Sequence, residues 1–179
     1  MSTSFKSAME RLKANIRDVP DFPKKGIVFK DITPILANGQ LFRLAVTIFA
    51  ERYQRKSIER IVAIDARGFI FGGALAHYLG IGLSVVRKKG KLPYESHGIE
   101  YELEYGQGTL EMHIDAVEKN QRVVIIDDLL ATGGTAEAAA KLVQKCGGEI
   151  VELAFLVELG FLKGRERLKK YPVFSAITY

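Results

Sequence analysis

The chain has 179 residues, of which 47% are hydrophobic and 26% charged, a composition typical of one globular domain and unlike a disordered or collagen-like chain. The net charge of +5 fits nucleic acid, a membrane surface or a small polyanionic ligand as partner. Cys146 is the only cysteine, which excludes an internal disulfide and favours a reducing compartment. The N-terminal residues lack the apolar stretch of a signal peptide, and no apolar run approaches the ~18 residues that span a bilayer. We therefore expect a cytoplasmic protein without membrane contact.

The predicted elements alternate between helices and short strands. The first 35 residues predict a helix followed by an extended loop, and an apolar stripe over residues 41–49 predicts a second helix. Further helices are expected at residues 69–79 and 136–146. Four apolar, largely β-branched runs predict buried parallel strands, at residues 61–64, 83–86, 123–126 and 150–157. This alternation predicts an α/β fold with a doubly wound, mostly parallel sheet.

The segment between Lys91 and Lys119 interrupts this pattern. It carries seven acidic residues and no lysine or arginine, and residues 101–105 and 109–114 alternate around a glycine-containing turn. We expect an antiparallel hairpin outside the parallel core, forming a flap over about residues 90–115. A small N-terminal hood over about residues 1–35 completes a single domain of residues 1–179.

The strongest functional motif is VVIIDDLLATGGT at residues 123–135. A buried strand ends in Asp127 and Asp128, and a loop of threonines and glycines then opens a helix. Ligands of open α/β sheets bind at this end of the strands. Glycines and a helix N-terminus favour a phosphate, and paired carboxylates accept hydrogen bonds from ribose hydroxyls. The competing interpretation, a simple helix cap beside two solvated acids, has to explain the strand, both acids and the loop together.

Other motifs for nucleotide or metal chemistry fail. The chain has no GxxxxGK[ST] sequence, and Gly80-Ile81-Gly82 precedes a strand and lacks a third glycine, so neither a P-loop nor a dinucleotide fold is indicated. His77, His97 and His113 lack metal-like spacing. The basic cluster at residues 163–170 is typical of a solvated helix face, and no nucleic-acid-binding module is present.

The motif VVIIDDLLATGGT resembles the phosphoribosyl-pyrophosphate signature of the type I phosphoribosyltransferases, and its LLATGGT spelling resembles the members that act on adenine. Five further stretches resemble the same family, with Ala66 at a position where the family commonly has serine. They are DFPKKGIVFKDITP (21–34), DARGFIFG (65–72), RKKGKLP (87–93), LEYG (103–106) and LVELGFLKGRE (156–166).

The resemblance implies roles for individual residues. The phosphate loop would comprise Ala131, Thr132, Gly133, Gly134 and Thr135, with Asp127 and Asp128 at the ribose. Pyrophosphate would contact Arg67, Arg87, Lys88 and Lys91, with Lys89 as a weaker candidate. The main chain of Val28 and Lys30 would bind the base, Phe29 and Leu159 would pack near its faces, Glu104 would exchange a proton with the purine, and Tyr105 would cover the site. Taken singly, Arg67 and the basic run at residues 87–91 are better explained as exposed charges. Val28, Phe29 and Leu159 are explained nearly as well as ordinary core, and Glu104 equally well as an exposed carboxylate.

The resemblance further implies transfer of a phosphoribosyl group from phosphoribosyl pyrophosphate to adenine, giving AMP and pyrophosphate in purine salvage. The expected cofactor is Mg²⁺, carried mainly by the donor and met by Asp127 or Asp128 through water. A homodimer with Arg67 near the subunit boundary and a cis peptide at Asp65-Ala66 are also implied. Two alternatives stay open: another purine as acceptor, or a regulator that keeps the donor pocket and binds DNA or RNA. We expect small-molecule partners and no nucleic acid.

Overall fold

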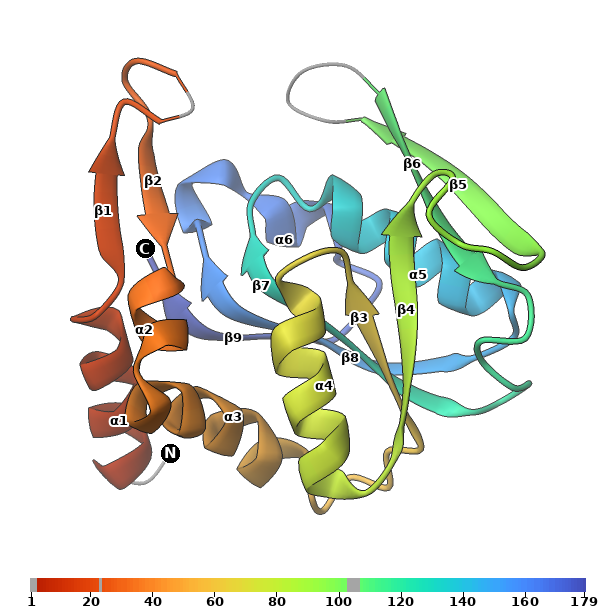
Figure 1. Cartoon of the computed structure of the whole chain (residues 1–179), viewed down its shortest axis with the longest axis horizontal. Coiled ribbons are helices and arrows are strands. Elements are labelled where there is room, and N and C mark those ends of the chain that lie inside the picture. The colour runs from red at the N-terminus through yellow and green to blue at the C-terminus, as the bar shows by residue number, and fades with distance from the viewer. Residues whose placement is uncertain (1–2, 23, 103–106) are drawn as a thin grey trace. The chain divides into compact units, whose positions relative to one another are not determined.

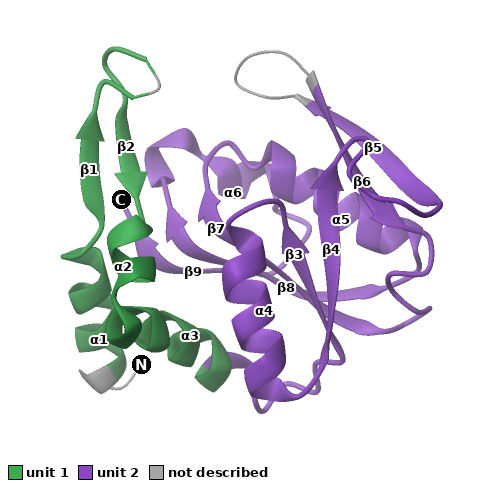
Figure 2. Ribbon diagram, in the orientation of Figure 1, with its two compact units in different colours: residues 1–51 green, residues 52–179 purple. Residues whose placement is uncertain are grey.

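The computed structural model describes residues 3–22, 24–102 and 107–179. It divides into two compact units, Met1–Glu51 and Arg52–Tyr179 (Figure 2). Within the described residues, no helix is long and apolar enough to cross a membrane.

The first unit combines short helices with one hairpin. Its elements are α1 (Thr3–Lys13), β1 (Arg17–Pro20), β2 (Val28–Asp31), α2 (Thr33–Ala37) and α3 (Gly39–Tyr53), whose last two residues belong to the second unit. β1 and β2 pair antiparallel, with Arg17 opposite Asp31 and Pro20 opposite Val28.

The expected extended loop near the N-terminus is therefore wrong in part. Between the strands the chain turns where Asp21 and Gly26 adopt positive φ values of 58° and 89°, and the Asp21 carboxylate accepts a 2.7 Å hydrogen bond from the Gly26 N–H. Pro20 occupies the last position of β1, a strand end where a missing N–H is tolerated. Pro20 is thus compatible with a short hairpin.

The second unit is built on one seven-stranded sheet with the order β5-β6-β4-β3-β7-β8-β9 (Figure 1). β3 (Arg60–Ile64), β4 (Gly82–Lys88), β7 (Arg122–Leu130), β8 (Glu149–Glu158) and β9 (Val173–Thr178) run parallel. The helices are α4 (Gly68–Leu79), α5 (Gly134–Lys145) and α6 (Gly164–Arg167), and a short 3-10 turn, η1 (Gly160–Leu162), precedes α6. The four predicted strands and the mostly parallel sheet are confirmed.

Helices α4 and α5 cover opposite faces of this sheet. A Cβ on Gly72 of α4 would lie 2.6 Å from the Ala63 Cβ, so Ala63 points toward α4. Its neighbours Val62 and Ile64 point to the other face and share a buried cluster with Ala139 and Val143 of α5. Burial on both faces explains why these strands are continuous apolar runs.

The predicted hairpin is confirmed, with different boundaries. β5 (Ser96–Glu102) and β6 (Gln107–His113) pair antiparallel, and β6 also pairs antiparallel with β4. Gly108 lies within β6 opposite Tyr101, although we placed it in the turn. Leu110 and Met112 of β6 are buried in the main core, so the base of the hairpin extends the sheet.

Candidate active site

A cavity of about 430 Å³ opens in the second unit where the segments after β3 and β7 meet. The register pairs Ala63 of β3 with Val85 of β4 and with Ile126 of β7, so the carboxyl ends of these strands lie side by side, where ligands of such sheets bind. The lining residues are Asp65, Ala66, Arg67, Lys88, Tyr101, Leu110, Asp127, Asp128, Leu129, Leu130, Ala131, Thr132, Gly133, Gly134, Thr135 and Ala136.

The loop between β7 and α5 forms one wall of the cavity. Its Gly133 takes a left-handed backbone conformation with φ 84° and stands at the N-cap of α5, a conformation that glycine adopts without a steric penalty. The first N–H groups of a helix have no helical acceptor, and the helix dipole adds partial positive charge there. Thr132, Gly134 and Thr135 also line the cavity, so this wall is suited to a phosphate.

Two adjacent carboxylates face the same space. Asp128 is only 5% exposed, and its Oδ2 accepts a hydrogen bond from Arg67 Nε. The Asp127 Oδ1 accepts a 2.8 Å hydrogen bond from the Asp128 N–H. Burial, followed by repulsion from the Asp128 charge, raises the pKa of Asp127 well above its usual value. Asp128 therefore carries the ion pair with Arg67, while Asp127 holds a proton more readily.

The turn after β3 brings Arg67 to these carboxylates. The Asp65-Ala66 peptide is cis, as expected, and α4 begins at Gly68 directly afterwards. A Cβ on Gly68 would lie 2.9 Å from both Asp127 Oδ1 and the Ile126 carbonyl oxygen. Only glycine permits this close approach of α4 to the end of β7.

The basic segment at the end of β4 and directly after it, Arg87 to Lys91, is divided between the cavity and its rim. Lys88 lines the cavity. Arg87 Nε donates a 3.3 Å hydrogen bond to Asp65 Oδ2, and Arg87 Nη1 donates a 3.1 Å bond to the Lys91 carbonyl oxygen. The Lys89 N–H bonds to the Thr109 carbonyl oxygen of the hairpin. Arg87 thus contacts the cavity through Asp65, and Lys91 is not among the lining residues.

The remaining predicted site residues lie in several places. Val28, Phe29 and Lys30 belong to β2 of the first unit, where the Phe29 ring meets the Phe22 ring edge-on at 5.2 Å and Lys30 Nζ lies 2.6 Å from Asp18 Oδ1. Leu159 follows β8 in the second unit. The predicted residues Glu104 and Tyr105 lie outside the described part of the chain. The roles of all these residues toward a ligand stay predictions.

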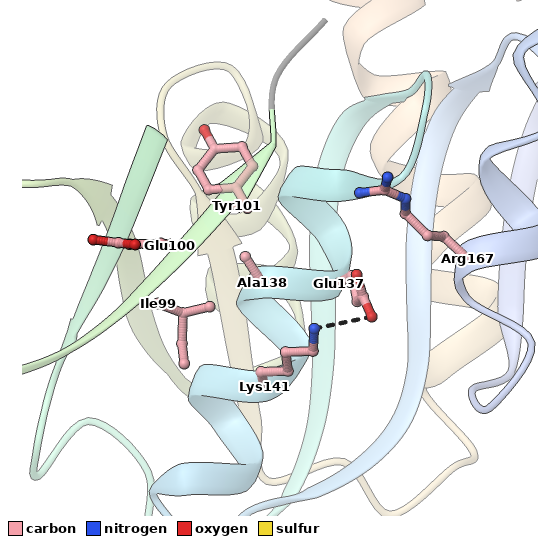
Figure 3. A pocket seen from close by; sticks show the side chains of 7 residues that line it. All are labelled: Ile99, Glu100, Tyr101, Glu137, Ala138, Lys141 and Arg167. Carbon is pink, nitrogen blue, oxygen red and sulfur yellow. Dashed lines mark ion pairs between the residues drawn. The ribbon is translucent and has the colours of Figure 1, made fainter. Parts of the chain in front are cut away.

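The cavity also contains residues that our sequence analysis did not select. Asp65 directly follows a predicted strand, as Asp127 does, so the same rule applies to it. Tyr101 and Leu110 come from the hairpin, and only the strand register places them here. Tyr101 also lines a second cavity of about 340 Å³ between β5, α5 and α6, together with Ile99, Glu100, Glu137, Ala138, Lys141 and Arg167 (Figure 3).

Comparison with known proteins identifies the family. The family model of the phosphoribosyl transferase domain matches residues 31–177. A protein of Methylacidiphilum infernorum named adenine phosphoribosyltransferase is 55% identical over 179 residues, covering all of both chains. The crystal structure of the adenine phosphoribosyltransferase of Thermoanaerobacter pseudethanolicus superimposes with a TM-score of 0.92 at 51% identity, covering 96% of this chain and 99% of that one.

A more distant structure shares the same fold. The Saccharomyces cerevisiae adenine phosphoribosyltransferase, solved with an imino-altritol bisphosphate and adenine, has a TM-score of 0.91 at 40% identity and covers 96% of this chain and 99% of that one. Together with the glycine-bearing loop, the Asp127–Asp128 pair and Arg67, these matches show that the chain belongs to the adenine phosphoribosyltransferase family.

Proposed function

We propose that this protein transfers the phosphoribosyl group from phosphoribosyl pyrophosphate to adenine, forming AMP and pyrophosphate. The observation that carries the proposal is one cavity in which a phosphate-binding loop, two carboxylates and Arg67 converge, in a chain 55% identical along its whole length to an adenine phosphoribosyltransferase. We assign this purine-salvage reaction to the cytoplasm, because the single cysteine suits a reducing compartment.

Each wall of the cavity suits one part of the donor. The Thr132–Thr135 loop would bind the 5′-phosphate through backbone N–H groups. Asp127 and Asp128 would accept hydrogen bonds from the ribose hydroxyls, and Arg67 and Lys88 would face the pyrophosphate. Arg67 already pairs with Asp128, so binding of a diphosphate would draw the guanidinium from a carboxylate toward a more highly charged anion.

We expect a magnesium ion to bind together with the donor, mainly through the donor's phosphates. The described residues contain no group of three or more His, Cys, Asp or Glu side chains that would hold a metal alone. Mg²⁺ commonly uses one or two carboxylates, several waters and substrate phosphates, and Asp127 and Asp128 supply the carboxylates. When bound, the ion would neutralise charge on the diphosphate and improve it as a leaving group.

In the reaction the bond between C1′ and the pyrophosphate oxygen breaks and a bond between C1′ and N9 of adenine forms. Positive charge develops at C1′ while negative charge builds on pyrophosphate, where Arg67 and Lys88 stabilise it. The adenine nitrogen loses its proton, and Glu104 remains our candidate for accepting it. Exclusion of water would prevent hydrolysis of the donor, the role predicted for Tyr105 and the flap.

The decisive test offers each purine to the purified protein with Mg²⁺ and phosphoribosyl pyrophosphate. Main-chain groups of Val28 and Lys30 would recognise the 6-amino edge of adenine, so we expect turnover with adenine to exceed that with hypoxanthine or guanine by orders of magnitude, because a mismatched polar edge leaves buried groups unpaired. Comparable rates with the three bases would refute the adenine assignment.

We also propose a homodimer, as the family resemblance implies. In support, α4 presents large apolar side chains to solvent: Tyr78 is 57% and Ile70 41% exposed, and Leu83 of the adjacent β4 is 39% exposed. Exposed apolar groups gathered on one helix favour burial against a second copy. Sedimentation should give a dimer at micromolar concentration, and Tyr78→Glu should weaken it. A wild-type monomer at that concentration would contradict the proposal.

A further inference from the structure

The segment between β8 and β9 packs its backbone directly against the phosphate loop. A Cβ on Gly164, the first residue of α6, would lie 2.2 Å from the Ala131 carbonyl oxygen. A Cβ on Gly133 would in turn lie 2.6 Å from the Gly164 carbonyl oxygen. The two glycines therefore allow two stretches of main chain to touch, and no side chain fits between them.

A second contact joins the start of this segment to the start of the loop. The Leu159 N–H donates a 2.9 Å hydrogen bond to the carbonyl oxygen of Leu130, the last residue of β7. The end of β7 and the loop after it thus meet the segment at Leu130, at Ala131 and at Gly133. Its outer side is supported by backbone, while its inner side faces the cavity.

Arg165 fixes this segment to the sheet. Its Nε donates to Glu158 Oε1 at 2.9 Å and its Nη2 to Glu158 Oε2 at 2.7 Å, and Nη1 donates to the Val173 carbonyl oxygen at 2.8 Å. Glu158 is only 5% exposed. A forked pair of this kind fixes direction as well as distance, so the residue next to Gly164 is tied to both β8 and β9.

We propose that the segment Leu159–Arg167 is a brace for the phosphate loop, and that Arg165 and Gly164 are positioning residues for the 5′-phosphate of the ligand. Neither residue lines the donor cavity, so both act through the loop. The inference rests on the proposed function, because it assumes that the loop binds a phosphate. A cradle of backbone N–H groups tolerates displacements of only about 0.5 Å, which is why an outer support matters.

A second arginine–glutamate pair on β8 provides a control for Arg165. Glu152, near the other end of β8, is 4% exposed and is likewise held by two guanidinium donors, from Arg52. Arg52→Met and Arg165→Met each remove the arginine partner of a buried glutamate on β8. Only the second variant loosens the segment that touches the loop.

The first experiment disturbs the contact between Gly164 and the loop. Gly164 has no positive φ, so Gly164→Ala adds steric contacts without backbone strain: the Cβ would lie 2.2 Å from the Ala131 carbonyl oxygen and 3.0 Å from Leu130 Cδ1. The first of these contacts has to open toward about 3.0 Å. We expect the affinity for AMP, measured by calorimetry, to fall at least about tenfold, because misplacement by about 1 Å has effects of this size or larger. The KM for adenine should change less than about twofold. The control is Gly39→Ala, where a Cβ meets nothing within 4 Å.

The second experiment decides the proposal even if Gly164→Ala does not fold. Arg165→Met should raise the KM for phosphoribosyl pyrophosphate and weaken ribose 5-phosphate binding about three- to tenfold. Arg165→Lys should recover part of the lost affinity. Arg52→Met should lower the stability of the fold but leave this KM and the ribose 5-phosphate affinity unchanged. If Arg165→Met and Arg52→Met show the same KM for phosphoribosyl pyrophosphate and the same affinity for ribose 5-phosphate, the proposal that Arg165 positions the phosphate loop is overturned. A wild-type protein that makes no AMP would instead overturn the proposed function.

Discussion

Replacement of Glu152 by glutamine should destabilise the fold strongly without altering the site. The carboxylate is 4% exposed and accepts hydrogen bonds from Arg52 Nε, from Arg52 Nη2 at 2.6 Å and from the Tyr53 hydroxyl at 2.7 Å, with Lys56 Nζ at 3.5 Å. A glutamine keeps the shape but turns one acceptor into a donor that faces the guanidinium. In the variant the glutamine NH₂ group would therefore face a guanidinium N–H group of Arg52, two donors without an acceptor, in a site that water reaches poorly.

The magnitude follows from the burial of the two partners. Loss of one member of a buried pair costs about 3–5 kcal/mol, but the Arg52 side chain is 31% exposed and water can rehydrate part of it. We expect a loss of about 2–3 kcal/mol in the free energy of unfolding, or roughly 5–10 °C in Tm for a chain of this size. Urea unfolding followed by circular dichroism measures it.

A matched variant on the same strand provides the comparison. Glu149 pairs with Arg122 at 2.9 Å, but its side chain is 57% exposed, so Glu149→Gln should change stability by less than about 0.5 kcal/mol. If Glu152→Gln unfolds at the same urea concentration as Glu149→Gln, burial does not determine the strength of these pairs and the reasoning fails.

The difference in stability between wild type and Glu152→Gln should depend on pH. Burial alone would raise the pKa of Glu152, but hydrogen bonds from Arg52 and Tyr53 and the charges of Arg52 and Lys56 lower it overall. A carboxyl group with a lowered folded pKa contributes stability above its unfolded pKa and loses it as pH falls through the folded value. The gap between wild type and Glu152→Gln should therefore close in acid.

Three further predictions concern the cavity. Burial and the Asp128 charge raise the pKa of Asp127. As the pH is lowered, AMP affinity should therefore begin to fall at a higher pH than it would if this carboxyl group had the usual aspartate pKa. Calorimetry should show a weaker dependence of AMP affinity on pH for Asp127→Asn. A raised folded pKa destabilises the fold as pH rises through it, so Asp127→Asn should melt at a higher temperature than wild type at neutral pH; a lower melting temperature would contradict this. Gly68→Ala should weaken donor binding, because its Cβ would lie 2.9 Å from Asp127 Oδ1, and an unchanged KM for the donor would show that α4 can move away.

The parts of the fold that were predictable are those set by local sequence. Continuous apolar runs identified the parallel strands because each is covered on both faces, and Gly133 marked a loop that needs a positive φ. Asp127 and Asp128 were found because they end such a run. In each case the neighbouring residues along the chain contain the information.

The parts that were missed depend on contacts between distant segments. Gly164 looked like an ordinary residue in a basic stretch, and its significance comes from the Ala131 carbonyl oxygen packed against it. Tyr101 reaches the cavity only because β5 pairs with β6 in a register that places it opposite Gly108. The N-terminal hairpin was missed because each of its strands has four residues, too few for alternation to be recognised.

The pairing of β3 with β7 has a consequence for how the chain folds. These adjacent strands join Arg60 to Val123 and Ala63 to Ile126, so the two halves of the donor cavity meet only after a long loop has closed. Such non-local pairing slows folding, because chain entropy is lost before contacts compensate for it. During synthesis Arg67 leaves the ribosome long before Asp127 and Asp128, the carboxylates beside it in the folded protein. Affinity for a phosphorylated sugar should therefore arise late in folding, when β3 and β7 pair.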